Sequence, residues 1–365
     1  MFASGCARRT ARTGKRRARG AFICVTGEPT AGIKRIQKIC FRPNRSRTAG
    51  ALAGKTGFMV TTKAELWGKY LGCMLGSALG DAIGELAFRF PEEGRLRAAI
   101  AAAPVLRYTD DTAMAIGLAE SLAERGGLDP PHLGRTFHRH FNREPWRGYA
   151  SGPPTIFQLV KKSGLTYEEA ARSLYGGQGS QGNGAAMRVA PLGLFFHDAP
   201  DLYDQAVAAA ALTHAHPLAQ DGAAVQAAAV AMAVHLDPQK PFPRDNFLRR
   251  MLKLAKTSEI REKLSLVRTL LKGKVPGPEA ARILGKSVRI DESLPFAIYA
   301  FIAQPHSFEN CLLGAVLNGG DRDTLGAMAG ALSGAYLGAT AITALWREKL
   351  ENQGLIERLA LALLV

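Results

Sequence analysis

Every fourth residue is glycine in the stretch Gly72-Cys73-Met74-Leu75-Gly76-Ser77-Ala78-Leu79-Gly80-Asp81-Ala82-Ile83-Gly84, and Gly68 extends the series. Each glycine costs a helix about 1 kcal/mol relative to alanine, so a helix with this sequence needs a compensating reason. Four-residue spacing places the glycines along one stripe of a helix, and a stripe without side chains lets another backbone come very close. We call this series the first glycine ladder. The second glycine ladder has the same spacing and comprises Gly326, Gly330, Gly334 and Gly338.

The rest of the chain from Trp67 onward consists of alanine- and leucine-rich runs separated by clusters of glycine and proline. Alternating patterns typical of strands are scarce. The sequence therefore predicts an all-α fold, with a single compact multi-helix domain over residues 59–365. The expected helices cover residues 66–79, 112–125, 203–212, 221–235, 247–254, 259–271, 278–284, 295–303, 307–317 and 324–346.

The positive charge of the chain is concentrated at its N-terminus. Residues 1–58 contain ten Arg, four Lys and one Glu, a net charge of +13, which leaves +3 for residues 59–365 out of the total of +16. The charge of the main body therefore does not argue for a nucleic-acid partner. For residues 1–58, the hypotheses are a transit peptide, a basic nucleic-acid arm, or a disordered or mis-started extension with translation beginning at Met59. We favour the last, because the recognisable motifs begin after Met59.

The five cysteines are odd in number and form no CxxC pair, which suits a reducing, cytoplasmic compartment and gives no sign of a disulfide framework. Four histidines are isolated in the sequence, and we expect them to be structural or surface residues: His132, His197, His235 and His306. We expect a monomer.

A membrane span is an alternative interpretation of residues 325–345, which carry no charge. We favour a buried helix of a soluble protein. The run is rich in Gly, Ala, Ser and Thr, and it begins directly at a pair of aspartates, which lipid disfavours.

Two short acidic motifs occur about two hundred residues apart. The first, Thr109-Asp110-Asp111-Thr112, stands where a loop becomes a helix. Acids are favoured there by the helix dipole, so an ordinary N-cap is the simpler interpretation of this motif alone. The second, Gly319-Gly320-Asp321-Arg322-Asp323-Thr324, carries its aspartates at i and i+2, and it too permits a cap. If the fold brings both motifs together, four carboxylates repel one another unless hard divalent cations fill the site.

Two further segments contain residue types suited to binding a ligand. The glycine-rich loop Gly182-Asn183-Gly184-Ala185-Ala186-Met187-Arg188 can expose backbone N–H groups to phosphate oxygens, although a flexible turn explains it equally well in isolation. His214 lies in a Thr-His-Ala-His-Pro junction between helices, where a neutral histidine bound to a ligand or a helix neighbour is favoured over a zinc ligand. Glu85 directly follows the first glycine ladder. Three roles are open for its side chain: a base, a ligand or a surface residue.

Together these segments resemble the ADP-ribosylglycohydrolase family, which includes the dinitrogenase reductase-activating glycohydrolase and the ADP-ribosylhydrolases that act on arginine or serine adducts. The resemblance runs through residues 72–84, 109–112, 182–188, 213–214 and 319–324, in the family's order. It implies an all-α enzyme that hydrolyses the bond between C1″ of the distal ribose and an attached group, on an ADP-ribosylated protein side chain or a small ADP-ribose conjugate.

The resemblance also implies a two-metal centre that holds Mg²⁺ or Mn²⁺, with helices that the glycine ladders let pack backbone to backbone. The implied metal ligands are Thr109, Asp110, Asp111, Asp321, Asp323 and Thr324. The implied substrate-binding residues are Gly182, Asn183, Gly184, Ala185, Ala186 and Met187 for the diphosphate, and His214 in the ADP-ribose pocket.

Two positions depart from the family pattern. Family members often carry Glu seven residues after the Gly-Asp of the first block, where this chain has Phe88. Several also carry an Asp in a glycine-rich segment that corresponds here to residues 149–155, which contain none. The catalytic candidates are therefore Glu85 and Asp111. The alternative hypothesis is a non-catalytic module that binds ADP-ribose or a nucleotide.

Overall fold

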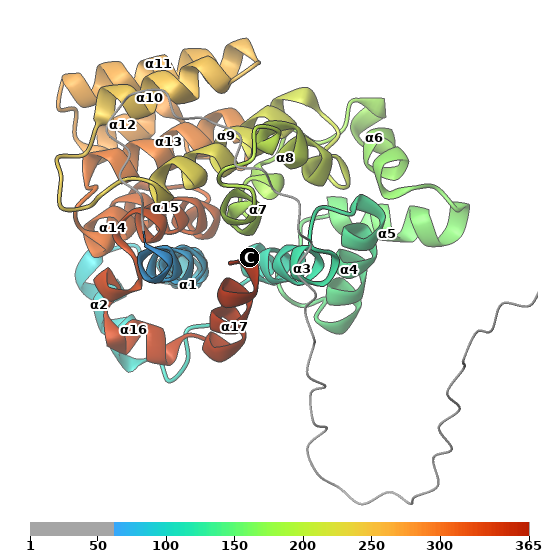
Figure 1. Cartoon of the computed structure of the whole chain (residues 1–365), viewed down its shortest axis with the longest axis horizontal. Helices are drawn as coiled ribbons and strands as arrows, with labels where there is room; N and C mark the ends of the chain where they lie inside the picture. The colour runs from blue at the N-terminus through green and yellow to red at the C-terminus, as the bar shows by residue number, and fades with distance from the viewer. Residues whose placement is uncertain (1–61, 365) are drawn as a thin grey trace, which may run out of the picture. The chain divides into compact units, whose positions relative to one another are not determined.

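The computed structural model describes residues 62–364, and the predictions for residues 1–58 fall outside this part of the chain. The described residues form α-helices and two 3-10 turns, without a β-strand, which confirms the all-α prediction (Figure 1). The elements are α1 (Lys63–Arg89), α2 (Glu93–Ala102), α3 (Asp110–Arg125), α4 (Pro130–Arg143), α5 (Gly152–Ser163), α6 (Tyr167–Gly177), η1 (Asn183–Ala185), α7 (Ala190–Phe195), α8 (Leu202–Ala211), α9 (Pro217–Val234), α10 (Arg244–Leu254), α11 (Ser258–Lys272), α12 (Gly277–Leu284), α13 (Ile290–Ala303), α14 (Phe308–Asn318), α15 (Arg322–Leu337), η2 (Ala339–Ala341), α16 (Ala344–Lys349) and α17 (Gln353–Leu363).

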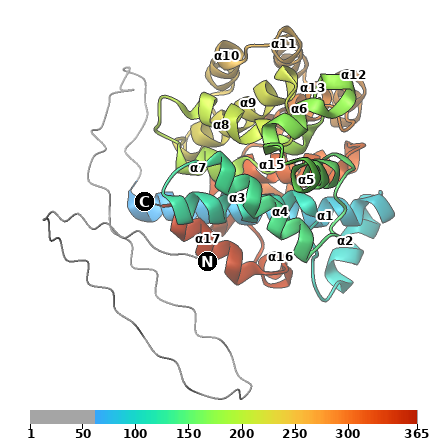
Figure 2. The same cartoon turned by 90° about the vertical axis from the view of Figure 1, so that its right-hand side faces the viewer.

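The two glycine ladders pack against each other. α1 and α15 lie side by side, and a Cβ atom added at Gly80 would overlap the carbonyl oxygen of Gly326 (Figures 1 and 2). Gly76 meets Gly330 in the same way. These pairings run in opposite directions along the two helices, so α1 and α15 are antiparallel and their backbones touch over several turns. Only glycine leaves room for this contact.

The antiparallel register brings the end of α1 to the beginning of α15. A Cβ atom at Gly84 would lie 2.5 Å from the Cα atom of Asp323. Asp81, one turn earlier in α1, is fully buried beside α3. The backbone contact therefore sets the distance between the first glycine ladder and the second acidic motif.

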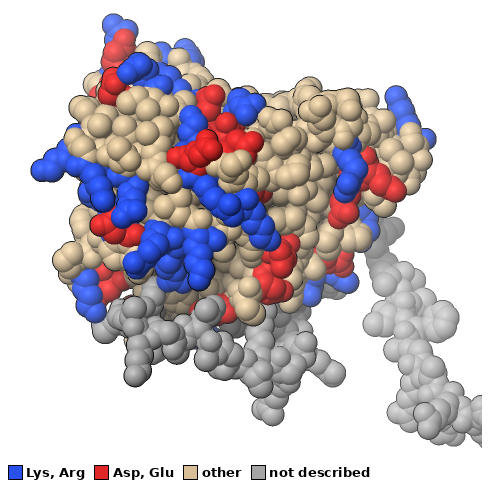
Figure 3. Space-filling model, turned by 90° about the horizontal axis from the view of Figure 1, so that it is seen from above, with Lys and Arg blue, Asp and Glu red and all other residues tan. Residues whose placement is uncertain are grey.

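Other helices enclose this central pair. α13 and α14 pack on α15, α9 packs on both α13 and α15, and α17 packs on α1 and α3. The hydrophobic core is continuous and includes the fully buried rings of Tyr70, Phe296, Phe301 and Tyr336. On the face that carries α10 and α11, lysine and arginine side chains alternate with acidic ones (Figure 3).

Helix boundaries differ from the sequence prediction at two places that matter here. α1 continues past residue 79 to Arg89, so Asp81 and Glu85 are helical. The predicted helix 324–346 is wrong at its end, because α15 stops at Leu337, where Gly338 takes a φ of 82°. A backbone in this left-handed region does not continue a right-handed helix.

One helix of the described residues, α1, is long and apolar enough to cross a membrane by its length and composition alone. Because 78% of its most apolar window is buried inside the protein, α1 is explained by its place in the core. Residues 325–345, where a membrane span was the alternative interpretation, contribute the buried α15 and then η2.

We predict that Gly80→Ala destabilises the protein by about 1–3 kcal/mol or more, because the new methyl group overlaps the backbone of α15. Gly68→Ala is the matched control. It lies in the same helix and ladder, its Cβ atom meets nothing within 4 Å, and it should stabilise the fold slightly. Urea unfolding followed by circular dichroism measures both. Equal effects of the two substitutions would show that the ladder contact does not constrain the fold.

Candidate metal centre and adjoining loop

The first acidic motif is held in place by Asp81 of α1. The Asp81 carboxylate accepts hydrogen bonds from the N–H groups of Thr109 and Thr112, each at 3.0 Å, and from their hydroxyls at 2.8 and 2.6 Å. These N–H groups belong to the start of α3, where a helix has no partners of its own for them. Asp81 therefore caps α3 from another helix and leaves Asp110 and Asp111 free of that task.

Four carboxylates of the two acidic motifs meet at this position. Asp110 and Asp111 start α3, Asp321 is the N-cap of α15, and Asp323 lies in the first turn of α15. Asp110 is 9% exposed and Asp111 is 3% exposed. Asp111 interacts electrostatically with Asp323, and Asp110 with Asp321, so the two acidic motifs lie near each other in the fold.

Burial and mutual repulsion raise the pKa values of these carboxyl groups. Burial, with Asp81 nearby, raises the pKa of Asp110 to about 7, and burial with Asp321 raises the pKa of Asp323 to about 8. Burial raises the pKa of Asp111 well above its ordinary value, with Asp323 adding to the shift. Burial also raises the pKa of Asp321, against a hydrogen bond from Asn183. Protein groups alone therefore do not keep all four carboxylates ionised near neutral pH.

The donor atoms fit a hard divalent cation. The Oδ2 atom of Asp111 is buried without a hydrogen-bond partner, a costly arrangement that a bound cation would relieve. Thr109 is partly buried; its hydroxyl donates to Asp81 and accepts from the Asp111 N–H at 3.4 Å, so one lone pair of its oxygen remains for a cation. Thr324 is buried, and its side chain hydrogen-bonds Asp321. Carboxylate and hydroxyl oxygens are the ligands that Mg²⁺ and Mn²⁺ prefer.

The glycine-rich loop contacts the second acidic motif directly. Asn183 donates from Nδ2 to Asp321 Oδ2 at 2.6 Å and also lies 3.2 Å from the Ser293 hydroxyl. Asn183 is 6% exposed, in the 3-10 turn η1. The loop that the sequence motifs predicted for phosphate therefore adjoins the candidate metal centre.

Most backbone N–H groups of the loop are already used within the protein. Those of Asn183, Ala186 and Met187 donate to backbone carbonyls, and that of Gly182 donates to the Ser180 hydroxyl. Within the loop this leaves the N–H groups of Gly184, Ala185 and Arg188. The amides that can meet a phosphate are thus fewer than the whole loop offers, and Gly184 and Ala185 are the two that are adjacent.

His214 packs on the same loop. A Cβ atom at Gly184 would lie 3.0 Å from His214 Nε2, so glycine is required at this contact. Arg188, at the end of the loop, donates to the Thr213 hydroxyl at 2.7 Å, and this hydroxyl lies 2.8 Å from His214 Nδ1. Because Thr213 accepts from Arg188 and donates onward, we assign the proton of His214 to Nε2, which faces the loop. Burial lowers the pKa of His214 to about 3, with Arg188 adding to the shift, so the ring is neutral.

Asp81, Arg188 and Tyr149 are site residues that the candidate list from the sequence did not include. Arg188 is a buried cation whose charge acts on Asp110 and Asp111. The Tyr149 hydroxyl is buried without a partner, and its pKa is raised by burial and by Asp110. Asp81 lies in the first glycine ladder and Arg188 in the glycine-rich loop, but the residues that they contact are distant in sequence. No sequence motif pointed to Tyr149, which lies in residues 149–155, the segment where several family members carry an Asp and this chain does not.

Glu85 lies in α1 one turn after Asp81, and Phe88 follows on the same side of the helix. Glu85 is exposed, and the Phe88 side chain is 49% exposed. In the described structure, no hydrogen bond joins the Glu85 side chain to the aspartate cluster. The proposed catalytic role of Glu85 therefore stays a prediction, whereas Asp111 lies within the cluster.

Comparison with known proteins identifies the family. The family model for ADP-ribosylglycohydrolase matches residues 62–365. The chain is 32% identical to ADP-ribosylhydrolase ARH3 of Homo sapiens over 286 residues, covering 68% of this chain and 75% of that protein. It is 30% identical to the uncharacterized protein YegU of Escherichia coli over 272 residues, covering 70% of this chain and 80% of that protein.

A solved structure has the same fold. The chain described as an ADP-ribosylglycohydrolase-related protein complex superposes with a TM-score of 0.64 at 28% identity, covering 82% of this chain and 98% of that one. The sequence motifs, the family model and the fold agree, and this chain belongs to the ADP-ribosylglycohydrolase family.

Proposed function

We propose that this ADP-ribosyl glycohydrolase cleaves the C1″ glycosidic bond of ADP-ribose conjugates at a centre of two divalent metal ions, Mg²⁺ or Mn²⁺. The observation that carries the proposal is the meeting of the two acidic motifs, with Asp111 Oδ2 buried and unpartnered. The proposed ligands are Thr109, Asp110, Asp111, Asp321, Asp323 and Thr324.

The number of oxygen donors supports the proposal of two ions. The two acidic motifs together offer four carboxylates, at the start of α3 and at the start of α15, with the Thr109 and Thr324 hydroxyls beside them. Ligands shared between two neighbouring ions spread over a wider region than those of one ion. When bound, a pair of divalent ions supplies a positively charged surface that orients ribose hydroxyls and favours a nucleophilic water.

The loop and His214 suit the remainder of the ligand. The Gly184 and Ala185 amides would donate to diphosphate oxygens, a role that small residues permit because the ligand approaches the backbone closely. The His214 Nε2–H group would donate to the ligand from the same side. Asn183 would couple the two halves of the site, because it hydrogen-bonds Asp321 while it belongs to the loop.

Cleavage of a glycosidic bond needs a proton donor for the leaving group and a base for water. In this chain the acid of the family pattern is replaced by Phe88. We propose Glu85 for proton transfer, because it is the ionisable side chain of the same helix face one turn from Asp81. As a metal ligand, Asp111 would contribute to catalysis by positioning the nucleophile.

The substrate class follows from the relatives. Several are named ADP-ribosylhydrolase, so we propose an ADP-ribosylated protein side chain or a small ADP-ribose conjugate as the substrate. Calorimetry with ADP-ribose together with hydrolysis of arginine- and serine-linked conjugates tests this assignment. Tight binding without turnover of any conjugate in Mg²⁺ or Mn²⁺ would instead support the non-catalytic binding module.

Asp323→Asn should lower metal occupancy by at least one ion and reduce the hydrolysis rate by about 10³-fold, the scale of losing an electrostatic stabiliser in a catalytic site. The helical circular dichroism spectrum should persist. Equilibrium dialysis with Mn²⁺ and a single-turnover hydrolysis assay measure the two effects. Asp245→Asn is the control, because Asp245 is an exposed acid paired with Arg268. Full activity of the Asp323→Asn variant in chelator would show that the motifs are only helix caps.

Metal-free protein should lose stability as the pH rises. Asp110 and Asp323 have pKa values of about 7 and 8 in the folded state, above the ordinary value of about 3.9 for an unfolded aspartate. Between these values the folded state binds more protons than the unfolded state, so the free energy of unfolding falls with rising pH.

Chelator-treated protein should therefore melt at a lower temperature at pH 8 than at pH 5, and Mn²⁺ should raise the melting temperature more at pH 8. Differential scanning calorimetry measures the melting temperature as a function of pH, with and without Mn²⁺. In the metal-free Asp323→Asn variant, the melting temperature should fall less steeply with rising pH. A metal-induced shift that is the same at both pH values would contradict the proposed ligand set.

Glu85→Gln should reduce kcat by about 10²-fold or more, the usual contribution of a general acid or base, while the Kd for ADP-ribose stays unchanged. Glu92→Gln provides the control, because Glu92 is another exposed acid, in the loop after α1. Equal kcat values for Glu85→Gln and the unaltered protein would remove Glu85 from the mechanism.

A further inference from the structure

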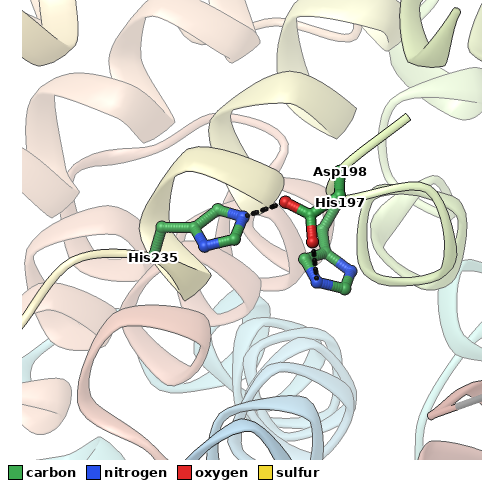
Figure 4. Close-up of side chains that lie close together, drawn as sticks. All are labelled: His197, Asp198 and His235. Atoms are coloured by element: carbon green, nitrogen blue, oxygen red, sulfur yellow. Dashed lines mark ion pairs between the residues drawn. The ribbon is translucent and has the colours of Figure 1, made fainter. Parts of the chain in front are cut away.

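Two histidines and an aspartate converge at a place away from the aspartate cluster. His197 and Asp198 follow α7, and His235 is the C-cap of α9. The Asp198 carboxylate lies between the two rings, 3.1 Å from His197 Nε2 and 3.0 Å from His235 Nε2 (Figure 4). The three ligand atoms all lie within 4.8 Å of one another. The function proposed above makes no use of this group.

The other ring nitrogen of His197 is already committed. His197 Nδ1 lies 2.9 Å from the carbonyl oxygen of Leu194 and 2.8 Å from the Tyr70 hydroxyl, which itself donates to that carbonyl. A carbonyl only accepts, so Nδ1 carries the proton. In the neutral ring the lone pair is then on Nε2, which faces Asp198. A histidine that donates its second N–H group to a carbonyl is the usual arrangement of a metal ligand.

His235 presents its Nε2 atom to the other oxygen of the same carboxylate. Burial lowers the pKa of His235, against the opposing effect of Asp198, so this ring tends to be neutral. A neutral imidazole is the form that binds metal. The His197 and His235 ring centroids are 5.2 Å apart, and one ligand atom from each ring lies within 4.8 Å of the other and of an Asp198 oxygen.

We propose that His197, Asp198 and His235 bind one transition-metal ion of the Zn²⁺ type, through both Nε2 atoms and the Asp198 carboxylate. Two imidazoles and a carboxylate are a common zinc donor set, and neighbouring ligands about 2.0–2.2 Å from one tetrahedral ion stand roughly 3.3 Å apart. The observed N···O separations of 3.1 and 3.0 Å are close to that spacing. The Asp198 side chain is 74% exposed, so the ion can enter from solvent and keep a water as its fourth ligand.

This site is separate from the aspartate cluster in place and in chemistry. Tyr70, which contacts His197, precedes Asp81 by eleven residues in α1, a distance of roughly 16 Å along a helix. Nitrogen ligands select Zn²⁺ or Co²⁺, whereas the aspartate cluster offers oxygen only. Lys69 is a nearby cation that acts against metal binding, although its amino group is turned to the carbonyl of Val234.

A metal ion here would connect parts of the fold that are distant in sequence. The segment after α7 and the end of α9 would share one ion, and Tyr70 joins both to α1 through its contact with His197. An ion that binds only the folded state raises its stability by mass action. We therefore expect a structural effect rather than a catalytic one.

The test uses the full chain, stripped with chelator and then saturated with Mg²⁺ to occupy oxygen-ligand sites. Titration with Co²⁺ should give tetrahedral d–d absorption bands at one equivalent, and Zn²⁺ should abolish them by competition. His235→Ala should weaken Zn²⁺ binding by about 100-fold or more. Removal of a residue that only hydrogen-bonds a metal ligand already costs about 10–100-fold, and loss of a ligand itself should cost at least as much. Asp198→Ala, at an exposed position, provides a second variant that leaves the core intact and should lose affinity similarly.

His132→Ala is the matched control, because His132 also pairs with a carboxylate, Glu124 at 3.2 Å, but has no second histidine. Its Zn²⁺ affinity and Co²⁺ spectrum should equal those of the unaltered protein. One equivalent of Zn²⁺ that persists in both His235→Ala and Asp198→Ala would overturn the proposal, as would the absence of tetrahedral Co²⁺ bands. Because Asp323→Asn should leave these bands unchanged, the result is independent of the function proposed above.

Discussion

The backbone contact between α1 and α15 is the constraint on which the rest of the structure depends. Glycine carbonyls of one helix occupy the space where side chains of the other would be, and this happens in both directions along the pair. Such a contact has one register, because a shift by a single residue places side chains against backbone. The register joins the end of α1 to the start of α15, and thereby places Asp81 and the second acidic motif in one region.

This rigid pair supports an arrangement that is unfavourable in itself. Two buried and two partly buried carboxylates repel one another, and burial and this repulsion raise their pKa values. Hydrogen bonds from Thr109 and Thr112 to Asp81, and from Asn183 to Asp321, hold the surrounding groups in place. A site that is strained without its ligand and relaxed with it is the expected form of a preorganised metal centre.

The sequence was sufficient for the fold class and the close backbone approach, because glycine spacing and helix composition are local properties. It also indicated both acidic motifs, whose residues are adjacent. It was insufficient for Asp81, because its partners are 28 and 31 residues away and only the fold makes it a cap. The relay from Arg188 through Thr213 to His214 and the convergence of His197 with His235 are likewise products of tertiary packing. The end of α15 at Leu337 was missed because Gly338 continues the four-residue spacing while it takes a left-handed conformation.

The central claim is that two motifs distant in sequence form one dinuclear site. Electron paramagnetic resonance of the full chain, saturated with Mn²⁺ in the presence of ADP-ribose, addresses it most directly. The account predicts the multiline spectrum of an exchange-coupled pair of Mn²⁺ ions, because ions that share carboxylate ligands are about 3.5–4 Å apart. A spectrum of isolated Mn²⁺ ions only, or of Mn²⁺ free in solution, would contradict it.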